Sequence, residues 1–290
     1  MDFTITTYKA LLNAFLSNGY KFLTVSEYIA SNFTTSEPII MLRHDVEAKY
    51  ENALLLAKLQ SVEGVNGTYY FRLFPEKKNE QIIRQIASMG HEIGYHYDDL
   101  SHCKGDRQQA INRFEQHLAW LRQIAPVTSI TMEGAPMSKY DNRNLWTKSS
   151  LINTQYTTHN SPLATHNSQL ITPHSLLTTH YSDFGITSEP YFDLDFDRLF
   201  YLTDTARRWD GWKYSRRDKL KQQAVWNAKE WKYHHSIDII RALNNNTFPS
   251  QLMMTFHPQR WAVNRTQWAA EFIGQNLKNI IKRLLSTNWE

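Results

Sequence analysis

Short apolar runs alternate with longer amphipathic stretches over most of the chain, which is the pattern of a β/α protein with mainly parallel strands. The apolar runs predict strands at 39–42, 68–71, 92–96, 127–132 and 252–256. Amphipathic spacing predicts helices over about 50–62, 80–89, 107–124, 224–243 and 265–285. Gly90 is a typical helix stop, and Asp106 is a typical helix cap. We therefore expect an α/β fold around a parallel sheet.

The middle of the chain has a different composition. Residues 147–183 are rich in Ser, Thr, Asn and His and poor in charge. They predict a long surface excursion, with a lid as one interpretation, and no domain of its own. The full length of 290 residues fits a single β/α barrel. We expect one domain over residues 1–290 that carries this excursion.

Composition narrows the class of protein. Hydrophobic residues make up 41% and charged residues 21% of the chain, which is typical of a globular protein with a substantial core. The N-terminal segment has no basic region followed by a long apolar run, and no stretch reaches the length of a membrane span. Cys103 is the only cysteine. These features predict a cytoplasmic protein without a membrane span or an internal disulfide.

The positive charge raises the question of a nucleic-acid partner. The net charge is +4 and the pI is about 9.0. Lysines and arginines are interleaved with acidic residues, however, and no long basic block occurs. This pattern disfavours nucleic-acid binding, and the sequence leaves the oligomeric state open.

Polar residues gather where the predicted strands end. The segments 43–47 (RHDVE), 96–99 (HYDD) and 257–261 (HPQRW) follow three strands, and Glu133 follows a fourth. In a β/α barrel the carboxyl ends of the strands converge on one face, and that face holds the active site. The four segments together therefore predict one site rich in His and carboxylate.

These residue types suit metal-assisted amide hydrolysis. Imidazole and carboxylate ligands hold Zn²⁺ or a similar divalent ion and leave a position for water. The ion lowers the pKa of that water and polarises a carbonyl. A nearby carboxylate or His can take the proton of the water, and another His can protonate the leaving amine.

Several motifs carry a family resemblance. The segments MLRHDVE, GTYYF and GHEIGYHYDD resemble the opening of the NodB-like polysaccharide deacetylases, carbohydrate esterase family 4. The segments PMSKYDNRNLW, EPYFDLDF, FYLTDTARRWDG and FHPQRW are similar to a divergent branch with an RHDVD-type first motif, associated with surface-polysaccharide biosynthesis. The resemblance runs from about Leu42 to the final helix. It implies a single irregular (β/α) barrel, NodB-like and seven-stranded, with deacetylase activity.

The resemblance also implies roles for particular residues. Asp45 matches the first aspartate of the TFDD motif of the family, which acts as general base or lies beside the metal. His96 matches the first histidine of the HxxxH metal motif. His257 matches the histidine of the final motif, which acts as general acid. Arg143 is a counterpart of an arginine that orients the catalytic aspartate.

The first motif departs from the family pattern at the second aspartate. That position is Val46 here, which cannot bind a metal ion. Glu47 or His44 must replace the missing carboxylate if the metal site is complete. Glu47 therefore joins the expected ligands, and His44 is also a candidate for substrate contact.

The later motifs depart as well. The second histidine of HxxxH falls at Leu100, and Asp99 or His102 lies close enough to substitute. Glu133 and Ala135 stand where the branch has His and Ser. We expect a divalent metal ion as cofactor, and zinc as its identity. Its expected ligands are Asp45, Glu47, His96 and Asp99.

Two groups of arginines are candidates for substrate binding. Arg207 and Arg208 either belong to a solvated loop or bind a phosphate or carboxylate on the substrate. Arg260 and Trp261 lie beside His257 and are stronger candidates. The expected substrate-binding residues are His44, Glu133, Arg143, Arg207, Arg208, Arg260 and Trp261.

The function that these observations favour is removal of an N-acetyl or other acyl group from a sugar or nucleotide-sugar. The departures leave two alternatives with the same fold. One is a catalytically silent carbohydrate-binding protein, and the other is a metal-free amidohydrolase that acts on small C–N substrates.

Overall fold

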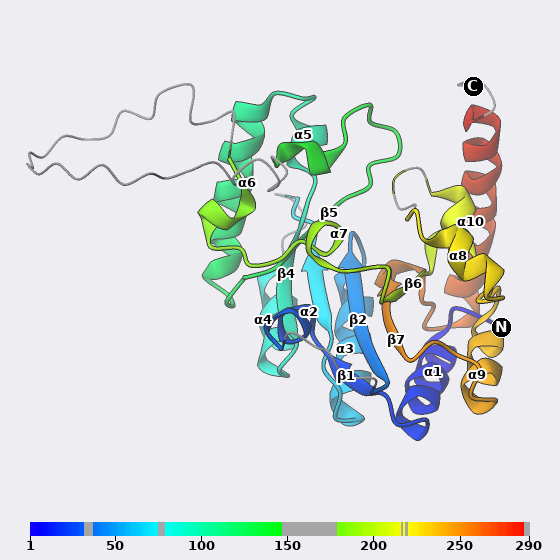
Figure 1. Cartoon of the computed structure of the whole chain (residues 1–290). Helices are drawn as coiled ribbons and strands as arrows, with labels where there is room; N and C mark the ends of the chain where they lie inside the picture. Colours follow the sequence, from blue (N-terminus) through cyan, green and yellow to red (C-terminus); the bar gives the residue numbers. More distant parts are fainter. Residues whose placement is uncertain (32–36, 75–78, 147–178, 216, 218–219, 287–290) are drawn as a thin grey trace, which may run out of the picture.

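A computed structural model describes residues 1–31, 37–74, 79–146, 179–215, 217 and 220–286 (Figure 1). Its seven strands all pair in parallel, in the order β5-β4-β3-β2-β7-β6, and β1 also pairs with the first half of β2. The strands are β1 (Lys21–Leu23), β2 (Ile39–Val46), β3 (Thr68–Phe71), β4 (Glu92–Tyr97), β5 (Ile130–Met132), β6 (Phe200–Thr203) and β7 (Gln251–Phe256). This arrangement confirms the expected α/β class and the seven-stranded sheet. No pairing joins β5 to β6 among the described residues, so the barrel is irregular and open between them.

Helices surround the sheet, and several lie beyond the carboxyl ends of the strands. In Figure 1 the strand arrows point towards the side where α5, α7, α8 and α10 are found. The helices are α1 (Ile5–Ser17), α2 (Val25–Ala30), α3 (Tyr50–Val62), α4 (Glu80–Ser88), α5 (Asp99–His102), α6 (Arg107–Arg122), α7 (Pro190–Asp193), α8 (Gln223–Ala228), α9 (Ser236–Asn244) and α10 (Arg265–Ser286). Among the described residues, none of them combines the length and the apolar character needed to cross a membrane.

Two apolar clusters hold the sheet and the helices together. One cluster gathers side chains of α1, β1, β6, β7 and α9, and the other gathers side chains of α3, β3, α4, β4, α6 and β5. Strand β2 contributes to both, with Leu42 in the first cluster and Val46 in the second. The central strand is therefore buried along its whole length.

The prediction that the strand at 39–42 ends at Leu42 is wrong, because β2 continues to Val46. Three of the four added residues, Arg43, His44 and Asp45, are polar, yet all four are buried and paired with β3. Arg43 and Asp45 can lie inside the protein because their side chains form an ion pair with each other. A buried charge is tolerated when it is paired and hydrogen-bonded.

Other element predictions have mixed outcomes. Helix α3 and strand β3 have the predicted bounds, and Asp106 caps α6 by accepting a hydrogen bond from the amide of Gln109 at 3.0 Å. The predicted helix at 224–243 is wrong, because the chain forms two helices there, α8 and α9. Glu230 adopts a left-handed conformation with φ of 59°, which stops the first helix. Elements α1, β1, α2 and β6 were not predicted from the sequence.

Most of the excursion predicted at 147–183 lies outside the described residues. Its described end is not wholly at the surface, because Tyr181 is buried and its ring lies 6.1 Å from that of Trp146. The single-domain organisation over residues 1–290 stays a prediction.

Candidate active site

A cavity of about 260 Å³ lies at the carboxyl ends of β2, β4, β5 and β7, next to α10. This is the edge at which β/α barrels place their functional groups. Its walls carry most of the acidic and basic groups that the strand ends were expected to bring together. The lining residues are Arg43, Asp45, Glu47, His96, Met132, Glu133, Gly134, Pro136, Tyr191, Thr205, Ser215, Arg217, His257, Gln259, Arg260, Glu271 and Gln275.

The strand geometry of β2 decides which residues of the RHDVE motif reach this cavity. Successive side chains of a strand point to opposite faces. Arg43 and Asp45 line the cavity, whereas His44 is fully buried elsewhere. The His44 ring lies 2.9 Å from the Tyr8 hydroxyl and stacks on Tyr69 with the ring centres 4.1 Å apart. His44 is therefore not brought to the site, which corrects its expected part in metal or substrate binding.

Arg43, which the sequence analysis did not assign, fixes Asp45. Its Nε and Nη2 atoms donate to the two carboxylate oxygens of Asp45, both at 2.8 Å. Burial alone would raise the pKa of Asp45, but the charges of Arg43, His96 and His257 hold it below its usual value. Asp45 therefore stays ionised at the floor of the cavity, in a single orientation.

Glu47, His96 and Glu133 form the candidate metal-binding cluster. One ligand atom from each lies within 4.8 Å of the other two. The Nε2 atom of His96 is 3.2 Å from Glu133 Oε2 and 3.9 Å from Asp45 Oδ2. Burial and the nearby charge of Glu133 raise the pKa of Glu47, so a cation between the two carboxylates would relieve their repulsion.

The surroundings of the cluster fit a divalent ion. The Nδ1 atom of His96 lies 3.1 Å from the carbonyl oxygen of Thr131, which fixes the ring with Nε2 towards the carboxylates. Glu133 Oε2 is buried and has no hydrogen bond of good geometry, although His96 is close. One imidazole and several carboxylates suit zinc, and the number of oxygen donors also suits manganese.

His96 carries a charge when no ion is bound. Burial alone would lower its pKa, but Asp45, Glu133 and Glu47 raise it to about 9. The imidazolium then balances the neighbouring carboxylates. Metal binding would require this proton to leave, so metal affinity should increase with pH.

Asp204 is the main residue that the sequence analysis missed. It follows β6 and is fully buried. Its Oδ1 atom lies 2.5 Å from His257 Nδ1 and accepts a hydrogen bond from Arg260, and its Oδ2 atom accepts from the His257 amide and the Trp261 indole. The Nε2 atom of His257 consequently faces Glu47, with Oε1 at 3.5 Å. An acid directly after an apolar run could have identified Asp204, but the four-residue strand before it was not predicted.

Of Arg260 and Trp261, which were expected to contact substrate, only Arg260 lies at the cavity. Arg260 lines the cavity, as does Gln259, which donates to Glu47 Oε2 at 3.0 Å. Trp261 is fully buried and does not line the cavity. Its ring orients Asp204 and belongs to the apolar core.

Asp99, an expected metal ligand, is not brought to the cluster. Its carboxylate accepts hydrogen bonds from the Tyr95 hydroxyl at 2.9 and 3.0 Å and from Arg113 at 2.6 Å. Burial raises its pKa to about 7. Neither Leu100 nor His102, the other residues considered near this position, lines the cavity. Glu133, directly after the next strand β5, is the residue that accompanies His96.

Three arginines expected to bind substrate also lie outside the cavity. Arg143 pairs with Asp141, and Arg208 pairs with Asp210. Arg207 lies over two aromatic rings at 5.5 and 5.7 Å from their centres. The structure therefore gives these side chains structural contacts, and their part in substrate binding stays a prediction.

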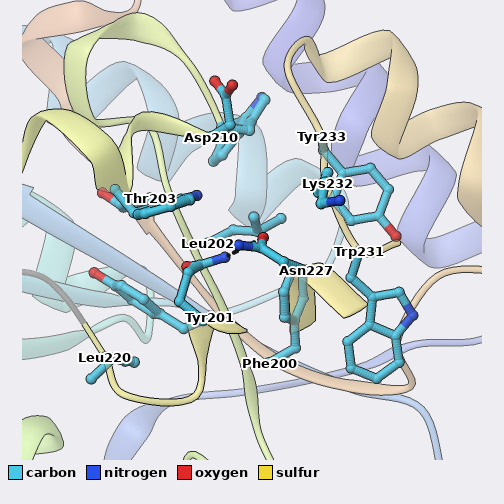
Figure 2. A pocket seen from close by; sticks show the side chains of 13 residues that line it. Phe200, Tyr201, Leu202, Thr203, Asp210, Leu220, Asn227, Trp231, Lys232 and Tyr233 are labelled. Atoms are coloured by element: carbon cyan, nitrogen blue, oxygen red, sulfur yellow. Dashed lines mark hydrogen bonds between the residues drawn. The ribbon is translucent and has the colours of Figure 1, made fainter. Parts of the chain in front are cut away.

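A second, smaller cavity lies beside Asp210 (Figure 2). Figure 2 shows it lined by aromatic and apolar side chains that include Phe200, Trp231 and Tyr233. Its volume is about 20 Å³, which is room for roughly one water molecule. It is too small for a sugar.

Comparison with known proteins gives only loose similarities. No protein-family model and no curated protein matches the chain. A family 4 carbohydrate esterase from Bacillus anthracis has a TM-score of 0.38 at 10% identity, over 91% of this chain and 83% of that one. The peptidoglycan deacetylase PdaC from Bacillus subtilis, in a mutant form, gives 0.36 at 11% identity, over 88% and 98%.

A third solved structure is a mutant of a pseudoenzyme of the same esterase family with restored enzymatic activity. Its TM-score is 0.37 at 10% identity, over 85% of this chain and 64% of that one. The present chain therefore spans less than two thirds of that protein. All three TM-scores lie below 0.5, so the function has to be argued from the site itself.

Proposed function

We propose that this protein is a metal-dependent hydrolase that removes an N-acetyl or other acyl group from a sugar-containing intermediate of surface-polysaccharide metabolism. The observation that carries the proposal is the convergence of Glu47, His96 and Glu133 in one cavity with Asp45 and His257. The family resemblance of the strand-end motifs gives the reaction class.

Glu47, His96 and Glu133 would hold the divalent ion, zinc or an ion of similar preference, with Asp45 beside them. A bound ion supplies polarisation of the acyl carbonyl and eases deprotonation of the attacking water. Gln259 keeps Glu47 in place through its hydrogen bond to Oε2. The Thr131 carbonyl does the same for the His96 ring.

Asp45 is the proposed proton acceptor for the attacking water. It lies within 3.9 Å of His96 Nε2, and its ionised form is kept ready by Arg43. The bidentate contact leaves lone pairs on both oxygens for a further hydrogen bond. The proton acceptor therefore needs no rearrangement before it acts.

His257 is the proposed proton donor to the leaving amine. Asp204 holds Nδ1, so that Nε2 faces the cavity. This pairing of an imidazole with a buried carboxylate fixes the orientation of the ring. Asp45 and His257 both line the cavity, so proton removal and proton delivery have separate groups.

The cavity suits a small polar substrate unit. Its volume lies near the lower end of the range for small-molecule sites. The amide and hydroxyl groups that line it, from Thr205, Ser215, Gln259 and Gln275, match the hydroxyl groups of a sugar. A nucleotide-sugar substrate and a cytoplasmic location remain parts of this proposal.

One observation favours a second candidate, a metal-free amidohydrolase. Each carboxylate near His96 already has a partner in the protein: Arg43 for Asp45, Gln259 for Glu47, and the Ala135 amide for Glu133. Asp45 and His257 could then act on an amide without an ion. The catalytically silent carbohydrate-binding alternative keeps the same cavity without turnover.

Elemental analysis of the purified protein tests the proposal, with His96→Ala as the variant and His234→Ala as a matched control outside the cavity. We expect near-stoichiometric metal in the wild type and the control, and none in His96→Ala. Acetate release from N-acetylated sugars should stop in chelator and return with metal.

The other outcomes separate the candidates. Full turnover in chelator would select the metal-free amidohydrolase. Tight sugar binding without turnover would select the silent binding protein. A wild type that takes up no Zn²⁺, Mn²⁺ or Co²⁺ would contradict the metal site itself.

A further inference from the structure

Arg217 makes a set of contacts to the main chain that the proposed chemistry does not use. Its Nη1 atom donates to the carbonyl oxygens of Gly134 and Ala135, and its Nη2 atom donates to that of Ser138 at 2.6 Å. Its Nε atom lies 3.6 Å from Asp141. A rigid guanidinium can hold several acceptors in one geometry because its donors are coplanar. Arg217 therefore ties the segment 134–138 to a part of the chain about 80 residues further on.

The segment that Arg217 holds carries a hydrogen bond to the metal-binding cluster. Ala135 has φ of 38°, a left-handed conformation that a non-glycine residue adopts only when its surroundings impose it. In this conformation its amide donates to Glu133 Oε1 at 2.9 Å. The carbonyl of the same residue accepts from Arg217 and from the Ser138 amide. Without these contacts the strained residue would be free to relax, and the donor to Glu133 would move.

We infer that Arg217 is a positioning residue that fixes the carboxylate of Glu133 for metal binding, through the carbonyl groups of residues 134–138. The inference rests on the proposed metal site. The guanidinium of Arg217 binds the Ala135 carbonyl, and the Ala135 amide binds Glu133 Oε1. The other oxygen of Glu133, Oε2, then lies next to His96 Nε2, at 3.2 Å. Hydrogen bonds to a ligand carboxylate of this kind typically change metal affinity by about 10- to 100-fold.

Arg122 supplies a matched control. Its guanidinium also binds main-chain carbonyl groups, those of Val127 and Gly185. It is not among the cavity residues and makes no contact with the cluster. Replacement of Arg122 by Lys therefore removes the same kind of contact from another part of the molecule.

The experiment measures dissociation constants of the metal-free protein for Zn²⁺ and Mn²⁺, without substrate. We expect Arg217→Lys and Arg217→Met to bind each ion about tenfold more weakly than the wild type. Arg122→Lys should bind like the wild type. The absorption spectrum of bound Co²⁺ should change in the Arg217 variants alone. Melting temperatures of the metal-free proteins identify any variant that fails to fold.

A double-mutant cycle with Glu133→Gln decides whether Arg217 acts through Glu133. If it does, Arg217→Lys should cause no further loss of affinity once Glu133 is replaced. Additive effects, or unchanged affinity in both Arg217 variants, would overturn the inference and leave the metal site intact. A wild type without metal affinity would overturn the inference together with the metal site, and the wild-type measurement alone reveals that case.

Discussion

Replacement of Asp204 by Asn should destabilise the protein strongly, although the two side chains have the same size. Each oxygen of Asp204 accepts two hydrogen bonds. Oδ1 accepts from His257 Nδ1 at 2.5 Å and from Arg260 at 2.9 Å. Oδ2 accepts from the His257 amide at 2.9 Å and from the Trp261 indole at 2.8 Å. Asn has only one acceptor atom, so either orientation turns an NH₂ group towards two buried donors.

The magnitude follows from these four contacts. A buried donor that loses its acceptor costs about 1–3 kcal/mol, and two are lost in either orientation. The negative charge that offsets Arg260 is lost as well, and breaking a buried ion pair by removing one partner costs about 3–5 kcal/mol. The two figures overlap because they describe the same contacts. We expect the free energy of unfolding to fall by about 3–5 kcal/mol at pH 7.

Urea unfolding followed by tryptophan fluorescence measures this difference. Asp210→Asn is the control, because its carboxylate pairs with partly exposed Arg208 and His234 and should contribute less than about 1 kcal/mol. His257 and Arg260 hold the pKa of Asp204 below its usual value, so its stabilising effect is lost as the pH falls. The difference in free energy of unfolding between wild type and Asp204→Asn should therefore become smaller below about pH 4. A loss below about 1 kcal/mol at pH 7 would refute the reasoning.

Two further predictions concern positions outside the cavity. Gly94→Ala should destabilise the sheet by about 3 kcal/mol or more. The new Cβ atom would lie 2.3 Å from a ring carbon of Tyr70 and 2.9 Å from the Ser129 carbonyl oxygen. A melting temperature equal to that of the wild type would contradict this prediction. Burial raises the pKa of Asp99 to about 7, above its value of about 4 in the unfolded chain, so folding favours its neutral form and this stabilising effect is lost as the pH rises from about 4 to 7. Unfolding curves from pH 4 to 8 should show the free energy of unfolding of Asp99→Asn rising relative to that of the wild type by up to roughly 4 kcal/mol, with little further change above pH 7, and a difference independent of pH would exclude this pKa.

The sequence predicted local elements well where length or residue type marks them. Helix α3 and strand β3 have the predicted bounds, and Asp106 caps α6 as expected. Strands β1 and β6 have only three and four residues, too few for a periodic pattern to stand out, and the equally short β3 was recognised from its run of aromatic residues alone. The break between α8 and α9 depends on the left-handed conformation of Glu230, which its residue type does not signal.

The candidate site was predicted in outline. Polar residues after apolar runs identified Asp45, His96, Glu133 and His257, and all four line one cavity. The same rule could not choose between neighbouring polar residues. It selected Asp99, whose carboxylate binds Tyr95 and Arg113 outside the cavity.

The sequence by itself determined the parallel α/β class and the edge of the sheet at which the chemical groups gather. Both follow from local patterns, since apolar runs predict the strands and the carboxyl ends of parallel strands share one edge. Only the tertiary structure decided which side chains meet there. Strand β2 continues as far as Val46, so the alternation of its side chains brings Asp45 into the cavity and His44 into the core. Asp204 and Arg217 act on residues far away in the sequence, and no local pattern records such contacts.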